Sequence, residues 1–402
     1  MKKMRTLTLG VLTFALACST GMAQKKSKFS YPVASDPDKV FQANEDIYTN
    51  TKYHHEVKEI KFKGNVKKRA KNVILMVSDG TGTTQFFTAI AANHNKAYIE
   101  QMPVTGFSKT ASSDRFVTDS AAGATAFSIG EKTYNHAIGV DKNKQPKETI
   151  LETAEKRGLS TGVVATSKIT HATPAAFIAH QEHRNMYEAI AADFVKSDVD
   201  LFIGGGRKEF VDRKDGRNLE QELKDKGFTV INKTSDLANA KGQKIAGLLA
   251  DDHMPRFTER GEMLETATKK AIDVLSQNKK GFFLMVEGSQ VDWGGHANNT
   301  SMITEEVLDF DKTLGAVLEF AAKDGNTLVI VTADHETGGY SVPYGSMEKS
   351  EIVGRFTSPS HTAVMVPVFA FGPGSEEFMG TYENNEIYHK MMKAFRFRKE
   401  GI

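Results

Sequence analysis

The sequence predicts an α/β protein: a three-layer sandwich in which helices flank both faces of a large, mostly parallel central sheet. Apolar runs at residues 72–77, 281–286 and 327–332 have the length of strands. Because polar residues do not alternate with apolar ones in these runs, the pattern is typical of strands covered on both faces. Segments with helical spacing separate the runs, and strands that alternate with helices form parallel sheets.

The other elements continue this alternation. Helices are predicted at residues 84–95, 147–157, 186–196, 261–277 and 304–322, and further strands at residues 161–166, 201–203, 228–231 and 366–371. Residues 24–71 are polar without a firm period, which indicates an extended lead-in. Residues 212–255 are rich in charge, and we expect a small peripheral insertion there. The main domain then spans residues 72–402.

The first 23 residues have the pattern of an export signal. Three basic residues precede an apolar run at residues 7–17, and a small-residue exit ends at Ala23. The apolar run is too short to cross a bilayer, so we expect no membrane span and a periplasmic or secreted protein. The only cysteine, Cys18, lies in this segment, and lipid attachment at Cys18 is the alternative.

The composition excludes some partners and some metal chemistry. The 52 basic and 50 acidic residues nearly balance, so nothing indicates the basic face of a nucleic-acid-binding protein. Cleavage after Ala23 leaves a chain without cysteine, which excludes disulfides and thiolate metal sites. Any metal ion must then take oxygen and imidazole ligands. The length suits one large α/β domain or two smaller ones.

The three apolar runs each end in a carboxylate. Asp79, Glu287 and Asp334 stand at these ends. An acid followed by glycine at a strand end is usually turn chemistry. Ligands of open α/β sheets, however, gather at the carboxyl ends of the strands. Parallel strands would bring the three carboxylates to one edge of the sheet.

The stretch FVTDSAAGAT, at residues 116–125, places a small hydroxyl side chain where a helix can begin. Ser120 follows Asp119 and precedes small residues. The first N–H groups of a helix are unpaired and favour a phosphate or a developing oxyanion. The alternative is that these residues only cap the helix, which is their commonest use.

Two sets of three residues have the composition of zinc ligands. They are Asp292, His296 and His361 in one set, and Asp79, Asp334 and His335 in the other. Three-ligand sites without cysteine fit catalytic zinc, which keeps one coordination position open. Two such ions about 4 Å apart can hold the attacking and leaving oxygens of a phosphoryl transfer. Isolated histidines are usually surface or core residues, and we interpret the following as such: His54, His55, His94 and His253.

A third set consists mainly of oxygen ligands. Glu287, with help from Asp79 and Thr173, forms a harder site that suits magnesium. Arg184 stands in QEHRN and is either a surface charge or a clamp, because its planar fork can bind two phosphate oxygens. We expect its neighbours His180 and His183 to be structural.

Six separated motifs resemble the alkaline phosphatase family and occur in the family's order. They are VSDGTG at Val77, TDSAAGAT at Thr118, HATPAAFIAH at His171, VEGSQVDWGGH at Val286, TADHETGG at Thr332 and SPSHT at Ser358. The resemblance covers nearly everything from residue 72 to the last strand. It implies that the chain is an enzyme that hydrolyses phosphate monoesters to an alcohol and inorganic phosphate.

The resemblance also implies roles for two residues. Ser120 would form a covalent phosphoserine, and Arg184 would bind the phosphate. The metals would be two zinc ions and one magnesium ion per subunit, on the three sets above. Many members are homodimers, so the resemblance allows a homodimer. A phosphodiesterase or related phosphoryl or sulfuryl hydrolase of the same superfamily is one alternative. An exported zinc-binding or phosphate-binding protein without activity is the alternative from another class.

Two positions depart from the best-known bacterial pattern. His171 stands where an aspartate often lies near the magnesium, and an imidazole there favours zinc over magnesium. We therefore place His171 next to the third metal. Trp293 stands where a lysine or histidine often lies near the phosphate. We expect Trp293 to border the substrate and to remove a cation from the pocket.

Overall fold

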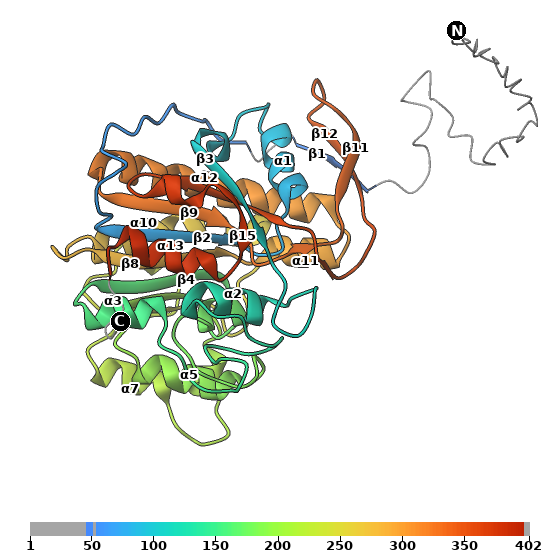
Figure 1. The fold of residues 1–402 in the computed structure, drawn as a ribbon. Coiled ribbons are helices and arrows are strands. Elements are labelled where there is room, and N and C mark those ends of the chain that lie inside the picture. The colour runs from blue at the N-terminus through green and yellow to red at the C-terminus, as the bar shows by residue number, and fades with distance from the viewer. Residues whose placement is uncertain (1–45, 51–53, 398–402) are drawn as a thin grey trace, which may run out of the picture. The chain divides into compact units, whose positions relative to one another are not determined.

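A computed structural model describes residues 46–50 and 54–397, and the predicted export signal lies outside them (Figure 1). Within these residues, ten strands form one sheet in the order β15-β3-β14-β9-β2-β8-β4-β5-β7-β6. In that order they span Gly380–Glu383, Val104–Lys109, Val366–Phe371, Thr327–Thr332, Asn72–Ser78, Phe282–Gly288, Ser160–Lys168, Leu201–Gly205, Ile245–Leu248 and Thr229–Ile231. Only β14 is antiparallel to its neighbours, so the prediction of a mostly parallel sheet is confirmed.

Helices flank this sheet on both faces (Figure 1). From α1 to α13 they span Thr83–Ala92, Ser120–Ile129, Ile150–Lys156, Ala172–Ala175, Tyr187–Lys196, Lys208–Val211, Leu219–Asp225, Thr234–Leu237, Phe257–Arg260, Met263–Leu275, Gln290–His296, Thr300–Asp324 and Glu386–Ala394. Two 3₁₀ segments, η2 and η3, span Tyr98–Gln101 and Ser375–Phe378. Across the described part of the chain, no helix combines the length and the apolar character that a membrane span requires.

The core consists of two apolar clusters, one on each face of the sheet. In β2, Val73, Leu75 and Val77 belong to one cluster, whereas Ile74 and Met76 belong to the other. Successive side chains of a strand point to opposite faces, which is why an unbroken apolar run fills both clusters. The first cluster also contains residues of α2, α3, α5 and α13, and the second contains residues of α1, α10 and α12. This arrangement confirms the predicted three layers.

The structure contains strands that the sequence does not predict. β3, β7 and β15 belong to the large sheet, and β1 (Asp46–Thr49) lies in the expected lead-in. β1 pairs with β12 (Glu351–Arg355), which also pairs with β11 (Ser341–Ser346). β3 alternates between buried and more exposed positions, and β15 is largely exposed, so neither has a strong apolar run. Such strands depend on pairing with distant segments more than on local composition.

The segment 212–255 lies at one edge of the large sheet. It supplies α7, β6, α8 and β7, and both strands pair within that sheet. The expected peripheral insertion is therefore a continuation of the sheet edge. Its charge reflects exposed helices, because α7 buries only Leu219, Glu220 and Leu223.

A buried ion triad joins α9 to α12. Arg260 donates to the carboxylates of Glu306 (3.0 and 2.6 Å) and Asp309 (2.7 Å), and all three side chains are at most 2% exposed. We expect Arg260→Met to lower the free energy of unfolding by about 3–5 kcal/mol, because two carboxylates then stay buried without a cation. Urea unfolding measures this loss.

An exposed ion pair provides the matched control. Lys393 and Glu377 lie 2.8 Å apart, with side chains 67% and 40% exposed. Lys393→Met should change the same free energy by less than about 1 kcal/mol. Equal effects of the two substitutions would contradict the role assigned to the buried triad.

Candidate active site

Three buried carboxylates lie at the carboxyl ends of adjacent strands. Asp79 follows β2, Asp334 follows β9, and Glu287 lies near the end of β8. The sheet order β9-β2-β8 makes these strands neighbours, and each of the three residues is fully buried. The structure thus places the three predicted acids on one edge of the sheet.

The first candidate metal group consists of Asp79, Asp334 and His335. Their ligand atoms all lie within 4.8 Å of one another. His335 Nε2 is 3.2 Å from Asp334 Oδ2 and 3.6 Å from Asp79 Oδ1. Neither oxygen of Asp79, nor Oδ2 of Asp334, has a hydrogen-bond partner among the described residues. Buried carboxylate oxygens are rarely left unpaired, so a cation fits this group.

The second candidate group consists of Asp292, His296 and His361. The two histidines face each other with their Nε2 atoms 3.1 Å apart, and Asp292 Oδ1 lies 3.4 and 3.5 Å from these atoms. Each Nδ1 lies within hydrogen-bond distance of a backbone carbonyl, at 2.8 Å for His296 and 2.9 Å for His361. Because a carbonyl only accepts, each neutral ring carries its proton on Nδ1. Two Nε2 acceptors then point at one space, which is the arrangement of a metal site.

The third candidate group contains Asp79, His171 and Glu287, whose ligand atoms also lie within 4.8 Å of one another. Thr173 lies in α4, two residues after His171. Its buried hydroxyl has no hydrogen-bond partner among the described residues. The same is true of Glu287 Oε1 and His171 Nδ1. The structure therefore brings Asp79 and Glu287 of the predicted set together with His171.

The buried carboxylates of these groups favour the binding of cations. Burial raises the pKa of Asp79 well above its ordinary value, and the nearby carboxylates of Asp334, Asp292 and Glu287 raise it further. Burial also raises the pKa of Glu287 to about 7. Neighbouring buried carboxylates repel one another when they are ionised. A bound cation removes this repulsion and lets all of them ionise.

Ser120 begins α2 and faces the first group. Its side chain is buried, and its Oγ lies 3.2 Å from His335 Nε2. Asp119 is the N-cap, because its carboxylate accepts from the N–H of Ala122 at 3.1 Å. The predicted helix start is confirmed. The cap is Asp119, and Ser120 is left facing the cluster.

Arg184 contacts Asp119, the residue that precedes Ser120. Its Nη1 donates to Asp119 Oδ2 at 2.9 Å, and its Nη2 donates to His171 Nε2 at 3.1 Å. The side chain of Arg184 is 17% exposed, so it is not the surface charge that was one of the two interpretations. Arginine presents its donors in a plane that matches two phosphate oxygens.

Some residues of this region have contacts that the sequence does not predict. His253, expected to be an ordinary surface or core residue, packs edge-on against Trp293 at 4.7 Å and lies 5.3 Å from His171, between ring centroids. Burial lowers the pKa of His253 to about 4. Thr337 donates to Asp292 Oδ1 at 2.5 Å and so fixes one predicted ligand. Thr337 lies within TADHETGG, so that motif was the available signal, whereas nothing marks His253.

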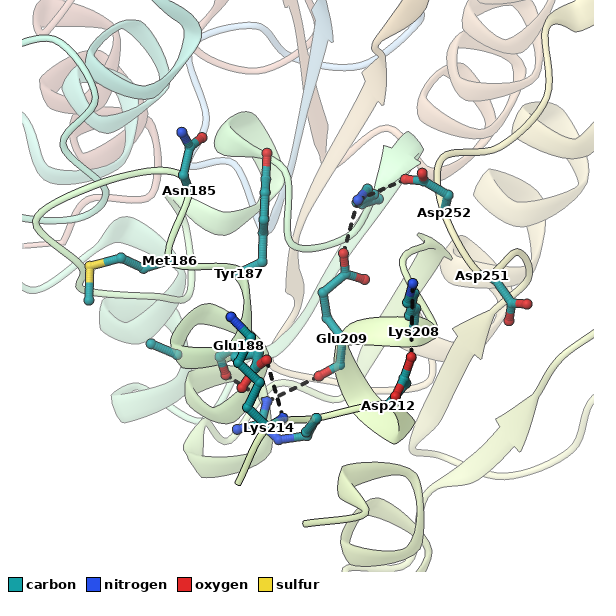
Figure 2. Close-up of a pocket in the computed structure, with 13 residues that line it drawn as sticks. Asn185, Met186, Tyr187, Glu188, Lys208, Glu209, Asp212, Lys214, Asp251 and Asp252 are labelled. Carbon is teal, nitrogen blue, oxygen red and sulfur yellow. Dashed lines mark hydrogen bonds and ion pairs between the residues drawn. The ribbon is translucent and has the colours of Figure 1, made fainter. Parts of the chain in front are cut away.

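A cavity of about 850 Å³ opens between the start of α5 and α6 (Figure 2). Its lining includes Asn185, which follows Arg184, and Asp251 and Asp252 of the segment 212–255. Lys168 pairs there with Glu209 at 2.9 Å and with Asp252 at 2.7 Å. None of the predicted site residues lines this cavity.

The fold and these groups define a metal-binding α/β enzyme. The family model for alkaline phosphatase matches residues 70–354. Alkaline phosphatase 4 of Bacillus subtilis is 35% identical, over 82% of this chain and 90% of that protein. Alkaline phosphatase of Escherichia coli K12 is 32% identical, over 81% of this chain and 86% of that protein.

Solved structures agree with these relatives. The alkaline phosphatase from the Antarctic bacterium TAB5 has a TM-score of 0.78 and 47% identity, over 83% of this chain and all of that chain. The cold-active enzyme from a Shewanella species has a TM-score of 0.76 and 32% identity, over 81% of this chain and 99% of that chain. The chain belongs to the alkaline phosphatase family and is a phosphomonoesterase.

Proposed function

We propose that this phosphomonoesterase acts through a covalent phosphoserine on Ser120. The observation that carries the proposal is the position of the Ser120 hydroxyl at the first turn of α2, 3.2 Å from His335 Nε2. The ring of His335 in turn stacks on the ring of His361, in the second group, with 3.5 Å between the ring centroids. The hydroxyl therefore lies where two candidate metal groups and a helix N-terminus meet.

The three ligand groups support a set of two zinc ions and one magnesium ion. Zinc suits the two groups that combine carboxylate with imidazole, Asp292, His296 and His361 in one and Asp79, Asp334 and His335 in the other. Magnesium suits the oxygen ligands Asp79, Thr173 and Glu287. When bound, such ions stabilise charge on the attacking and leaving oxygens and lower the pKa of water. A TAB5 alkaline phosphatase variant with one histidine replaced by aspartate is described with magnesium bound.

The chain's own residues then have the following roles. The Ser120 oxygen attacks phosphorus, and its bond to phosphorus forms as the bond to the alcohol oxygen breaks. Water next attacks the phosphoserine, releases inorganic phosphate and returns the serine hydroxyl. Arg184 and the N–H groups at the start of α2 hold the phosphoryl oxygens in both steps, which is the main contribution a protein makes to this transition state.

His171 belongs next to the third metal rather than among its ligands. Burial holds the pKa of His171 well below its ordinary value, so the ring is neutral. Since Arg184 donates to Nε2, the ring proton is on Nδ1. A donor at Nδ1 suits contact with a metal-bound water. If the ring instead ligates directly through nitrogen, zinc replaces magnesium in this group.

Trp293 is proposed as an apolar wall of the substrate site. It lies edge-on to His171, with 6.5 Å between ring centroids, and it follows the candidate ligand Asp292. An indole carries no positive charge, so Arg184 supplies the side-chain cation for the phosphate here. Release of phosphate should be correspondingly easier than with a second cation.

Arg184 separates a monoesterase from a diesterase. We expect Arg184→Ala to lower kcat/KM for an aryl phosphate by about 10²- to 10³-fold, because two charge-assisted hydrogen bonds are lost. A diester has one negative charge fewer and should lose less. Arg184→Lys keeps the charge without the fork and should be intermediate. Equal losses for monoester and diester would contradict a role of Arg184 in selecting the doubly charged monoester.

We also propose export and a domain division for this chain. Residues 1–23 act as an export signal, residues 24–71 precede the catalytic domain, and residues 72–402 form it. The mass of the protein recovered from outside the cytoplasm tests cleavage after Ala23 against lipid attachment at Cys18. Light scattering of the same sample tests a homodimer.

A further inference from the structure

We propose that His136 is a positioning residue for phosphate binding, which acts by fixing Asp119 and, through it, the guanidinium of Arg184. The inference rests on the proposed role of Arg184. Neither the sequence motifs nor the candidate metal groups include His136. Its importance follows from contacts between segments that lie far apart along the chain.

Three hydrogen bonds connect His136 to the two residues beside the phosphate site. Its backbone N–H donates to Asp119 Oδ1 at 2.9 Å, and its Nδ1 lies 3.1 Å from Asp119 Oδ2. Its carbonyl accepts from the backbone N–H of Arg184 at 2.8 Å. One residue thus holds the side chain of Asp119 and the backbone of Arg184 together.

The Asp119 carboxylate depends on His136 for half of its hydrogen bonds. Oδ1 accepts from the N–H groups of Ala122 and His136, and Oδ2 accepts from Arg184 Nη1 and is within reach of His136 Nδ1. A carboxylate accepts but does not donate, so Nδ1 of His136 must carry a proton. Without the imidazole, Arg184 is the one partner of Oδ2 left among the described residues, and the carboxylate can turn with it.

The conformation of His136 points to a use for its side chain. Its φ is +80°, in the left-handed region, where glycine is unstrained and most other residues are not. The imidazole, which is 45% exposed, stacks on His183, with ring centroids 5.0 Å apart and an angle of 24° between the planes. The left-handed backbone and this stacking together place Nδ1 3.1 Å from Asp119 Oδ2.

The consequence concerns binding more than the chemical step. Arg184 has one Nη on Asp119 and the other on His171, so these partners define the plane of its fork. A fork held in place before binding loses less entropy when phosphate binds. Substrate, product and transition state all contact the fork, so loosening it raises KM and the inhibition constant of phosphate together.

The test compares two substitutions that both tolerate a positive φ. His136→Gly removes the imidazole and keeps the backbone, whereas His136→Asn restores a donor near the position of Nδ1. With the metal-loaded full chain, KM for an aryl phosphate and Ki for inorganic phosphate are measured. We expect His136→Gly to raise both by about 3- to 10-fold, the equivalent of one hydrogen bond, with a smaller change in kcat. His136→Asn should recover at least half of the loss on a logarithmic scale.

His94→Gly is the matched control. His94 also has a positive φ, of 57°, but it is exposed and lies just after α1. The same exchange there should leave KM and Ki within about 2-fold of wild type, as expected for a surface substitution. Thermal unfolding of all variants verifies that each is folded.

Two results overturn the inference. One is a His136→Gly variant with unchanged KM and Ki; the other is a His136→Asn variant no better than His136→Gly, which leaves the imidazole without a role. Arg184→Ala, measured in parallel, separates the two levels of the argument. If Arg184→Ala leaves Ki unchanged, the proposed role of Arg184 is wrong. If Arg184→Ala raises Ki but His136→Gly does not, only the role of His136 is wrong.

Discussion

Ser120→Ala lowers the turnover of an aryl phosphate by on the order of 10³-fold or more, because the substitution removes the atom that forms the covalent bond. Folding should be almost unaffected. The N-cap of α2 is Asp119, which stays in place, and alanine is the best helix former. A loss of activity with an unchanged melting temperature therefore separates a chemical role of Ser120 from a structural one.

The covalent route has its own measurement. Enzyme and aryl phosphate are mixed rapidly at low pH, quenched, digested and analysed by mass spectrometry. Phosphate should be found on Ser120 in the wild type and be missing in Ser120→Ala. Ser128, buried on the same helix with its hydroxyl donating to the Thr125 carbonyl at 3.1 Å, provides the control, and Ser128→Ala should keep its phosphorylation on Ser120. Wild-type turnover by Ser120→Ala would contradict the phosphoserine intermediate.

Removal of metal should abolish activity and also destabilise the fold. The carboxylates of Asp79, Glu287 and Asp334 are fully buried at one sheet edge, and without cations they repel one another. A ligand present at a thousand times its Kd contributes about 4 kcal/mol to stability. We therefore expect dialysis against a chelator to lower the melting temperature by several degrees and to reduce activity at least about 10³-fold.

Restoring the metals distinguishes the three groups. Zinc alone should recover part of the activity, and zinc with magnesium should recover all of it. Elemental analysis should then give two zinc ions and one magnesium ion per chain; three zinc ions would instead mean that His171 is a direct ligand. Thr337→Val is a useful comparison, because it removes the hydrogen bond to Asp292 and the 3.2 Å contact with His335 Nδ1 while leaving every candidate ligand in place, and it should weaken zinc affinity by about 10- to 100-fold. Full activity in metal-free protein would contradict the metal assignments.

Much of the sheet could be predicted because its central strands are encoded locally. Each residue of β2, β8 and β9 is buried, and an unbroken apolar run is enough to recognise such a strand. β3 and β15 could not be predicted in this way. They lie beyond β14 at one edge of the sheet, where exposed positions break the apolar pattern.

The residues of the candidate site also differ in whether the sequence predicts them. The carboxylates at the strand ends could be predicted, since each stands next to its own strand in the sequence. The partner of Arg184 could not, because Asp119 lies 65 positions away and its local pattern is that of a helix cap. His253 and His136 carried no local signal. Their partners, Trp293 and His171 for His253 and Asp119 and Arg184 for His136, stand in other segments of the chain.

The sequence by itself determined the fold class, the family and the chemical types at the site, because strand periodicity and motif spacing are properties of neighbouring residues. Only the tertiary structure decided which atoms meet. It set the two Nε2 atoms of His296 and His361 face to face, shared the carboxylate of Asp119 between a helix cap and a guanidinium, and brought His136 to that carboxylate. The physical reason is that hydrogen bonds and metal sites act over about 3 Å, so their partners are set by how the strands and loops pack and not by their separation along the chain.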